Sequence, residues 1–157
     1  MFRAMRRSRQ QLTDKDCERI LTDERRAALA VHGEDGYPYA LPINFVYLPE
    51  ESAVAFHCAR EGHKLDALRN DPRVCLTVWT AGKQPEDWSY DVESVVIFGQ
   101  AEIVADEARR ENIARRLGNK YFPNPELTET NIRNGLCRAE IVVIRIRHMT
   151  GKLVHEK

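Results

Sequence analysis

Residues 56–65 read Phe56-His57-Cys58-Ala59-Arg60-Glu61-Gly62-His63-Lys64-Leu65, and within them a strand ends and a helix begins. Three potential cations, Arg60, His63 and Lys64, stand at the start of that helix. The helix dipole is positive there, so each cation costs about 0.3–1 kcal/mol unless an anion lies between them. Helix N-termini bind phosphate through free backbone N–H groups, and Gly62 lets such an anion approach closely. The segment therefore predicts a phosphate site, with three solvated surface side chains as the alternative.

The periodicity on either side of this stretch predicts mostly strands. Val74, Leu76 and Val78 alternate with other residues, which is the period of a strand with two different faces. Leu65 and Leu68 instead have helical spacing. By the same reasoning we expect strands over residues 27–31, 37–48, 53–58, 74–79, 89–105 and 137–148, and helices beginning near residue 14 and over residues 61–70, 106–117 and 126–133.

About six strands and few helices indicate a barrel that is mainly β with flanking helices. Closure into an antiparallel barrel removes the exposed edges that an open sheet of this size would carry. Pro42 and Gly99 interrupt two of the strands, which fits the irregular corners of a barrel, and Gly99 suits a bulge. A flat two-layer α+β sandwich is the alternative arrangement of these elements.

Length and composition fit one domain over residues 1–157. The 43% hydrophobic content is sufficient for one buried core. The 24 basic side chains balance the 24 acidic ones, so no net field favours nucleic acid or an anionic membrane as a partner. The basic start, Met1 to Arg7, is not followed by the apolar stretch of a signal peptide, and no apolar run is long enough to cross a membrane. We therefore expect a cytoplasmic protein.

The four cysteines lie far apart in the chain, at Cys17, Cys58, Cys75 and Cys137. None of them has the CxxC spacing of a zinc site, so the sequence predicts no metal site. Free thiols of this kind are usually buried as small apolar side chains, and we interpret all four in that way.

A second candidate for ligand binding is the strand Pro38-Tyr39-Ala40-Leu41-Pro42-Ile43-Asn44-Phe45. Pro42 removes one backbone donor from the ladder, and Asn44 places an amide among apolar neighbours. Such a strand leaves backbone groups free to bond to a heterocycle. An ordinary edge strand with an outward-facing Asn44 is the alternative interpretation.

Four segments, taken in order along the chain, resemble one known family. They are Gly36 to Phe45, Phe56 to Lys64, Asn70-Asp71-Pro72-Arg73-Val74, and Glu93-Ser94-Val95-Val96-Ile97-Phe98-Gly99. The series is similar to the flavin-binding split-barrel superfamily typified by pyridoxamine phosphate oxidase, and most closely to its nitroimidazole-resistance branch, over roughly residues 5 to 150. The resemblance implies a six-stranded antiparallel split β-barrel that binds flavin mononucleotide (FMN).

The resemblance also implies roles for individual residues. In the superfamily a Ser or Thr and an Arg-Lys pair hold the flavin phosphate, and these map onto Gly62, His63 and Lys64. Lys64 matches that pattern, while Gly62 and His63 depart from it. Around the isoalloxazine ring the resemblance places Pro42, Ile43 and Asn44 on one strand, His57, Cys58 and Ala59 on the neighbouring wall, and Ser94 from a second subunit.

His57 is the candidate catalytic residue. An imidazole at a strand end facing a cofactor can donate a proton to a substrate or hydrogen-bond the site. The nitroimidazole-resistance branch has an active-site His at the corresponding position, so the resemblance implies a catalytic role, with a structural His as the alternative. Trp79, Trp88 and Tyr90 are able to stack on a ring, but we interpret them as core aromatics.

The leading hypothesis is therefore an FMN-dependent oxidoreductase. It would reduce a small-molecule acceptor, such as a nitroimidazole, with electrons from a reduced nicotinamide. The sequence has no GxGxxG signature, so a nicotinamide would bind only transiently against the flavin. The resemblance also implies a homodimer with both flavin sites at the subunit interface.

Two other functions remain open. A non-catalytic module of the same fold would hold flavin or haem, with His57, His63, His148 and His155 as candidate axial ligands outside any haem signature. Pyridoxamine phosphate oxidase activity itself is the third possibility. Against it, the tail from Met149 to Lys157 does not resemble the substrate-binding segment of those oxidases.

Overall fold

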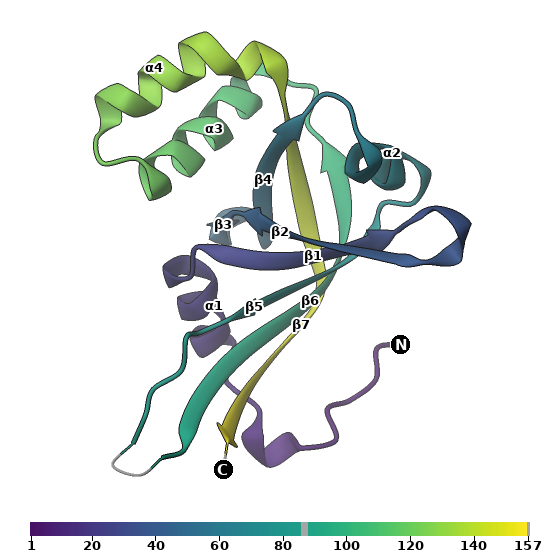
Figure 1. Ribbon diagram of the computed structural model, residues 1–157, viewed down its shortest axis with the longest axis vertical. Coiled ribbons are helices and arrows are strands. Elements are labelled where there is room, and N and C mark those ends of the chain that lie inside the picture. Colours follow the sequence, from purple (N-terminus) through teal and green to yellow (C-terminus); the bar gives the residue numbers. More distant parts are fainter. Residues whose placement is uncertain (86–87, 157) are drawn as a thin grey trace.

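Seven strands form one antiparallel sheet in the computed structural model, which describes residues 1–85 and 88–156 (Figure 1). The strands are β1 (Arg26–His32), β2 (Pro38–Asn44), β3 (Val46–Leu48), β4 (Ala53–Ala59), β5 (Arg73–Trp79), β6 (Tyr90–Ile103) and β7 (Ala139–Glu156). Their order across the sheet is β2-β1-β5-β6-β7-β4-β3. The α-helices beside it are α1 (Asp14–Asp23), α2 (His63–Asn70), α3 (Glu107–Tyr121) and α4 (Pro125–Gly135). None of the helices in the described ranges has the length and apolar character needed to cross a membrane.

The sheet is curled, because its two edge strands are consecutive in the chain. β2 ends at Asn44 and β3 begins at Val46, so Phe45 alone joins the two edges. Strands lie about 4.8 Å apart, so the edges of a flat sheet of this size would be separated by about 29 Å. A few residues of chain reach only about 10 Å, and the sheet must therefore close on itself. This geometry confirms the mainly β barrel and excludes the flat sandwich.

The strand expected over residues 37–48 is in fact two strands, which is why the sheet has seven strands instead of six. Residues before Phe45 pair with β1, and residues after it pair with β4. Side chains nevertheless alternate through the junction, since Ile43, Phe45 and Tyr47 belong to the central core while Val46 belongs to an outer cluster. The alternation that predicts a strand contains no signal for this change of partner.

The inside of the barrel holds the main apolar core. Alternate residues of every long strand point into it, and helices α1 and α2 contribute one apolar face each. The large side chains that are fully buried in this cluster are Ile20, Leu21, Leu29, Phe45, Phe56, Leu65, Leu76, Ile97 and Ile144. The two helices thus close the barrel, as expected for short amphipathic helices packed on a sheet.

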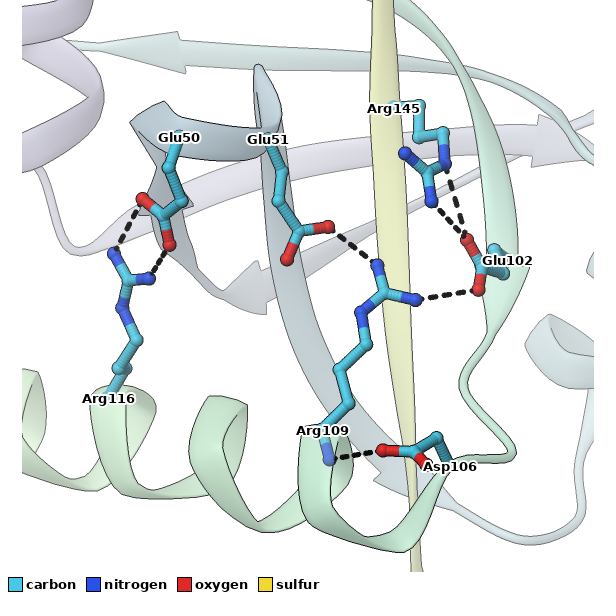
Figure 2. Close-up of polar contacts among 7 residues, drawn as sticks. All are labelled: Glu50, Glu51, Glu102, Asp106, Arg109, Arg116 and Arg145. Atoms are coloured by element: carbon cyan, nitrogen blue, oxygen red, sulfur yellow. Dashed lines mark hydrogen bonds and ion pairs between the residues drawn. The ribbon is translucent and has the colours of Figure 1, made fainter.

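A second apolar cluster lies outside the barrel, where α3 covers β3, β4 and β7. Its members are Val46, Leu48, Ala53, Ala55, Val104, Ile113, Leu117, Ile141 and Val143. Ion pairs fasten the same helix to the sheet: Arg109 donates to Glu51 and Glu102, and Arg116 pairs with Glu50 (Figure 2). Apolar burial and these ion pairs together fix the position of α3.

Helix α4 rests mainly on α3 and not on the sheet (Figure 1). Thr128 is the buried residue of α4, and it packs against Gly118 of α3. Arg115 and Glu129 add an ion pair of 2.5 Å between the two helices. The Asn124 side chain caps α4 by accepting a hydrogen bond from the Leu127 N–H. Helix α4 is therefore held along one side only.

Gly99 lies at the predicted bulge, where the β6–β7 register shifts between Phe98 and Gly99. A Cβ atom on Gly99 would lie 2.5 Å from Ile144 Cγ2 and 2.7 Å from the Arg145 carbonyl oxygen, so a side chain would not fit there. Strand β7 continues beyond its expected end at residue 148, because its last residues pair with the beginning of β6. The long β6–β7 ribbon results from this pairing.

Candidate functional site

Two cavities meet at Asn44 and His57. The first, named the cationic cavity, has a volume of about 390 Å³ and is lined by Arg26, Pro42, Ile43, Asn44, His57 and Lys64. The second, named the α4 cavity, has a volume of about 420 Å³ and lies between the barrel and the α3–α4 pair. Both volumes are in the usual range for small-molecule sites, about 300–1,000 Å³. The structure thus brings together Pro42, Ile43, Asn44, His57 and Lys64, which the sequence analysis placed in one ligand site.

Strand alternation turns Asn44 and His57 to the outer side of the barrel. In β4, Phe56 and Cys58 face the core and His57 faces outward. In β2, Ile43 faces the core and Asn44 faces outward. Because the Phe45 junction brings β2 close to β4, the two outward side chains meet at the same place.

Arg26 is the lining residue that sequence reasoning missed. It begins β1 directly opposite Asn44 in the antiparallel ladder, and its guanidinium group donates a hydrogen bond to Asn44 Oδ1. Arg26 therefore adds a permanent positive charge to the cavity, and it leaves the Asn44 amide NH₂ available as a donor. The signal that would have found it is the register between β1 and β2, which an arginine at a strand start does not reveal by itself.

The cations that the sequence analysis grouped together have separate partners. Lys64 lines the cationic cavity, and its Nζ lies 5.4 Å from the centre of the Phe56 ring. His63 stacks on Tyr39 with ring centres 4.3 Å apart. Arg60 lies 3.5 Å from a carboxylate oxygen of Glu140. Among the described residues that line this cavity, the cationic side chains are those of Arg26 and Lys64.

The start of α2 next to Lys64 has no side-chain cap. Gly62 precedes the helix with φ +119°, a backbone conformation that favours glycine. No heavy atom lies within 4 Å of the position that a Gly62 Cβ would take, so the space in front of this residue is open. Uncapped N–H groups at a helix start, beside a lysine and open space, are suited to an anion.

His57 is exposed at the point where the two cavities join, yet its pKa is lowered from the ordinary value. Loss of solvation within the concave site is the larger cause, and the positive charge of Lys64 adds to it. The imidazole is therefore neutral at pH 7. A neutral imidazole has one nitrogen that donates a hydrogen bond and one that accepts.

Two residues of the predicted site turn their side chains into the core, although Ile43 also lines the cationic cavity, and two others line neither cavity. The side chains of Ile43 and Cys58 are 6% and 9% exposed and belong to the main core. Ala59 ends β4 opposite Ala139 and lines neither cavity. Ser94 lies on β6, remote in sequence and in the ladder from this site.

Ser94 belongs to an outer face of β1, β5, β6 and β7 over which no helix lies in the described ranges (Figure 1). Side chains form rows across these strands, and most of them are apolar or uncharged. One row is Ala28, Thr77, Val96 and Thr150, and the next is Ala30, Cys75, Phe98 and His148. Phe2 of the N-terminal segment stacks on Phe98 and His148, but no α-helix of the described ranges packs here, and this face is named the uncovered face.

Trp79, Trp88 and Tyr90 are not core residues, contrary to the expectation from sequence. They are 49%, 71% and 43% exposed, respectively. Trp79 occupies an outward position at the end of β5, where the buried positions are those of Val74, Leu76 and Val78. Phase within the strand, and not residue type, decides which side chains enter the core.

Buried thiols were expected at all four cysteines. Cys17 and Cys58 are buried, but the expectation is wrong for Cys75, which is half-buried, and for Cys137, which is exposed. Cys137 lies in the short 3₁₀ turn Leu136–Arg138 before β7, where no element covers it. Cys17 is fully buried, and loss of solvation raises its pKa to about 11.

The histidines are dispersed through the structure. His155 bonds to Asp91 at 2.6 Å, His148 stacks on Phe2, and His63 stacks on Tyr39. Of the candidate haem ligands, His57 is therefore the one that lines a cavity. The described residues contain no cluster of His, Cys, Asp and Glu side chains able to hold a metal ion.

Residues 13–153 match the sequence profile of a family described as pyridoxamine 5′-phosphate oxidase. The chain belongs to this family. The matched range runs from the start of α1 into the last strand, so family membership extends over both cavities. No curated protein sequence matches the chain.

Several solved structures share the fold of this chain. A 5-nitroimidazole antibiotic resistance protein from Bacteroides thetaiotaomicron, so described, has a TM-score of 0.79 and 20% identity, over 93% of this chain and 87% of that one. A FAD-binding protein from Mesorhizobium loti has a TM-score of 0.70 and 22% identity, over 92% and 96%. A FAD- and haem-binding protein from Mycobacterium smegmatis has a TM-score of 0.70 and 22% identity, over 92% and 73%. Together these similarities confirm the split-barrel fold.

Proposed function

We propose that the cationic cavity binds FMN and that the protein is a flavin-dependent oxidoreductase. The observation that carries this proposal is that Arg26 and Lys64 line the same cavity. The outward-facing side chains of Asn44 and His57 line it too. Two positive charges match a phosphate monoester, which carries about −1.5 to −2 at pH 7. No carboxylate is among the described residues that line the cavity, so nothing there opposes an anion.

Strand β2 supplies the second feature that fits a flavin. It is an edge of the sheet, so one side of its backbone is free of ladder partners. Pro42 has no N–H group, and the Asn44 amide is oriented by Arg26. Backbone and amide groups of this kind are suited to the polar edge of a heterocyclic ring. Proteins of the same fold described as FAD-binding, or as FAD- and haem-binding, support a ring-shaped cofactor for this chain.

A bound flavin would supply the transfer of electrons between a donor and an acceptor. The residues of this chain would hold and orient it. Arg26 and Lys64 fix the phosphate end, and Asn44 donates a hydrogen bond from its amide. His57, whose lowered pKa favours the neutral form at pH 7, would offer one N–H donor and one acceptor nitrogen where both cavities meet. We propose a reduced nicotinamide as donor and a nitroaromatic compound as acceptor, in line with the description of the Bacteroides protein.

The uncovered face supports the homodimer as part of this proposal. Val96 and Phe98 expose apolar surface there, and Ser94 lies on the same strand and the same side. A second copy packed on this face would bury that surface, with Ser94 of one subunit directed toward the flavin of the other. Val96→Glu is expected to give monomers in sedimentation velocity and to weaken FMN binding. A monomer that keeps the affinity of the unchanged protein would contradict the shared site.

The test of the cofactor is a titration with FMN, followed by quenching of flavin fluorescence and by the visible spectrum. Lys64→Ala and Arg26→Ala each remove one charge-assisted bond of about 1.5–3 kcal/mol, so each is expected to weaken binding by about 10- to 150-fold while the protein stays folded. Lys15→Ala, which removes an exposed lysine of α1, is the matched control. Absence of saturable FMN binding by the unchanged protein would overturn the proposal.

Two further measurements separate the competing functions. The FMN-loaded protein is expected to oxidise a reduced nicotinamide when 2-methyl-5-nitroimidazole is present, and His57→Ala is expected to slow this reaction. Titration with haem in parallel tests the binding-module alternative, since a sharp Soret band with tight stoichiometry would favour haem. Oxidation of pyridoxamine phosphate would instead indicate the reaction after which the family is named.

A further inference from the structure

The α4 cavity is a compartment with different chemistry from the cationic cavity beside it. Its wall is built mainly of carbon, from Leu117, Phe122, Ile132, Leu136 and Ile141. No carboxylate, lysine or arginine is among the described residues that line it. A charged molecule would lose its hydration there without gaining a partner, so this cavity is suited to an uncharged and largely apolar molecule.

The wall holds few polar side chains, and those of Tyr121 and Asn131 already have hydrogen-bond partners. Asn44 and His57 form the boundary with the cationic cavity. Thr128, which is 1% exposed and packs against Gly118, also lines the cavity, and its buried hydroxyl bonds to no described atom. An unpartnered buried hydroxyl is uncommon, because the missing hydrogen bond costs about 1–3 kcal/mol. The cavity thus combines an apolar body with a few polar groups, which is typical of small-molecule sites.

Helix α4 forms one wall of this cavity without taking part in either apolar core cluster. Asn131 and Ile132 lie three and four residues after Thr128, and Gly135 lies three residues after Ile132, so all four share one side of the helix. A Cβ atom on Gly135 would meet no heavy atom within 4 Å, which shows that the side of the helix at this residue faces open space. Since α4 packs mainly on α3, its apolar side covers the cavity and not a packed sheet.

The geometry points to the α4 cavity as the binding site of the electron acceptor. The acceptor class is an uncharged molecule with a mostly apolar body and one hydrogen-bonding group that reaches Asn44 and His57. This inference rests on the proposed function, because the flavin would lie across the same two residues from the acceptor. Ile132 and Gly135 then determine which acceptor fits, although they are far in sequence from the cofactor residues.

The test uses 2-naphthol as a probe, since it has an apolar bicyclic body and one hydroxyl group. Its binding is measured by equilibrium dialysis with the FMN-loaded protein and with the FMN-free protein. Ile132→Trp fills the cavity and is expected to weaken 2-naphthol binding at least tenfold, while FMN affinity stays within about twofold. Asn134→Trp adds the same bulk to α4 at a position that does not line the cavity, and it is expected to change neither affinity.

Gly135→Leu is a second variant that fills the cavity, in case Ile132→Trp does not fold. Circular dichroism tests whether each variant is folded. Unchanged 2-naphthol affinity in a folded Ile132→Trp or Gly135→Leu variant would overturn the inference. So would the absence of saturable 2-naphthol binding by the unchanged protein. If the protein binds no FMN but the FMN-free form still binds 2-naphthol in the cavity, the proposed function fails and the cavity remains a ligand site.

Discussion

The Tyr121 hydroxyl lies 2.9 Å from the backbone nitrogen of Phe45 and 2.9 Å from its carbonyl oxygen. Phe45 is the fully buried residue at which the edge strand leaves β1 and joins β4, so its backbone has no regular ladder partner. The hydroxyl accepts a hydrogen bond from the Phe45 N–H, and it shares its proton between this carbonyl and that of Arg25, at 2.6 Å. At the junction that closes the barrel, one side chain from the end of α3 thus makes the hydrogen bonds that a neighbouring strand would otherwise make.

Replacing this hydroxyl is the first test of the fold. Tyr121→Phe leaves the buried Phe45 amide without a partner, and we expect the free energy of unfolding to fall by about 1–3 kcal/mol. Urea denaturation measures the loss. Tyr37→Phe is the control, because Tyr37 is 78% exposed. FMN affinity is expected to fall as well, since Asn44 is the adjacent residue, and equal stability of the two variants would contradict this role of Tyr121.

Lys120 provides a prediction for the pH dependence of stability. Its Nζ donates to the Glu24 carbonyl oxygen at 2.6 Å and lies 4.3 Å from the centre of the Phe45 ring. Burial, with a further effect of the Arg25 charge, lowers the pKa of Lys120 to about 8 from its ordinary value of 10.5. Between these two values the unfolded chain binds more protons at this residue than the folded protein does. Its contribution to the free energy of unfolding therefore rises with pH across that window and is constant below pH 8.

Comparison with Lys120→Met isolates this contribution from the titration of other groups. The unfolding free energy of the unchanged protein minus that of the variant is expected to be level from pH 6.5 to 7.5 and to increase by about 1 kcal/mol between pH 8 and 9. Urea denaturation at each pH gives the values. Lys15→Met, at an exposed position of α1, is expected to show no such increase, and a level difference for Lys120→Met would count against the lowered pKa.

The contact between α3 and α4 at Gly118 gives a third prediction. A Cβ atom at this position would lie 2.9 Å from Thr128 Oγ1 and closer still to Thr128 Cγ2. Gly118→Ala would add about 1 kcal/mol of helix propensity, but overpacking costs about 1–3 kcal/mol, so we expect a net loss of stability. Gly135→Ala is the matched control, since its Cβ meets nothing within 4 Å. Combining Gly118→Ala with Thr128→Ser removes the closest atom and is expected to recover part of the loss.

Arg110 is the buried charge that fixes the chain between α4 and β7. It is 6% exposed and donates to the carbonyl oxygens of Leu136 and Ala139, at 3.2 and 2.8 Å, and to Glu140 at 3.1 Å. Arg110→Met removes the nearer arginine partner of the largely buried Glu140 carboxylate, which keeps Arg60 at 3.5 Å, and we expect a loss of about 3 kcal/mol in thermal or urea unfolding. Arg69→Met breaks an exposed pair and is expected to cost less than about 1 kcal/mol. Similar losses of stability in the two variants would contradict the prediction that burial makes the Arg110 contacts stronger than the exposed pair.

Much of the fold was predictable because each strand is half-buried. Alternation identified the strands, and it also sets which residues of each strand share a side, so it separates His57 from Phe56 and Cys58, although the family resemblance placed Cys58 beside His57. Gly99 marked the bulge because a side chain has no room there. The exposure of Trp79 follows from the same pattern, and the sequence prediction failed there because residue type was given more weight than phase.

The sequence by itself determined which residues form strands and helices and which side of each strand is apolar, because these properties depend on neighbours a few positions away. Only the tertiary structure decided that the edge strand changes partner at Phe45, that Arg26 stands opposite Asn44, and that α4 encloses a cavity beside His57. Each of these depends on the register and closure of a barrel, which bring distant segments together. Local periodicity carries no information about such contacts.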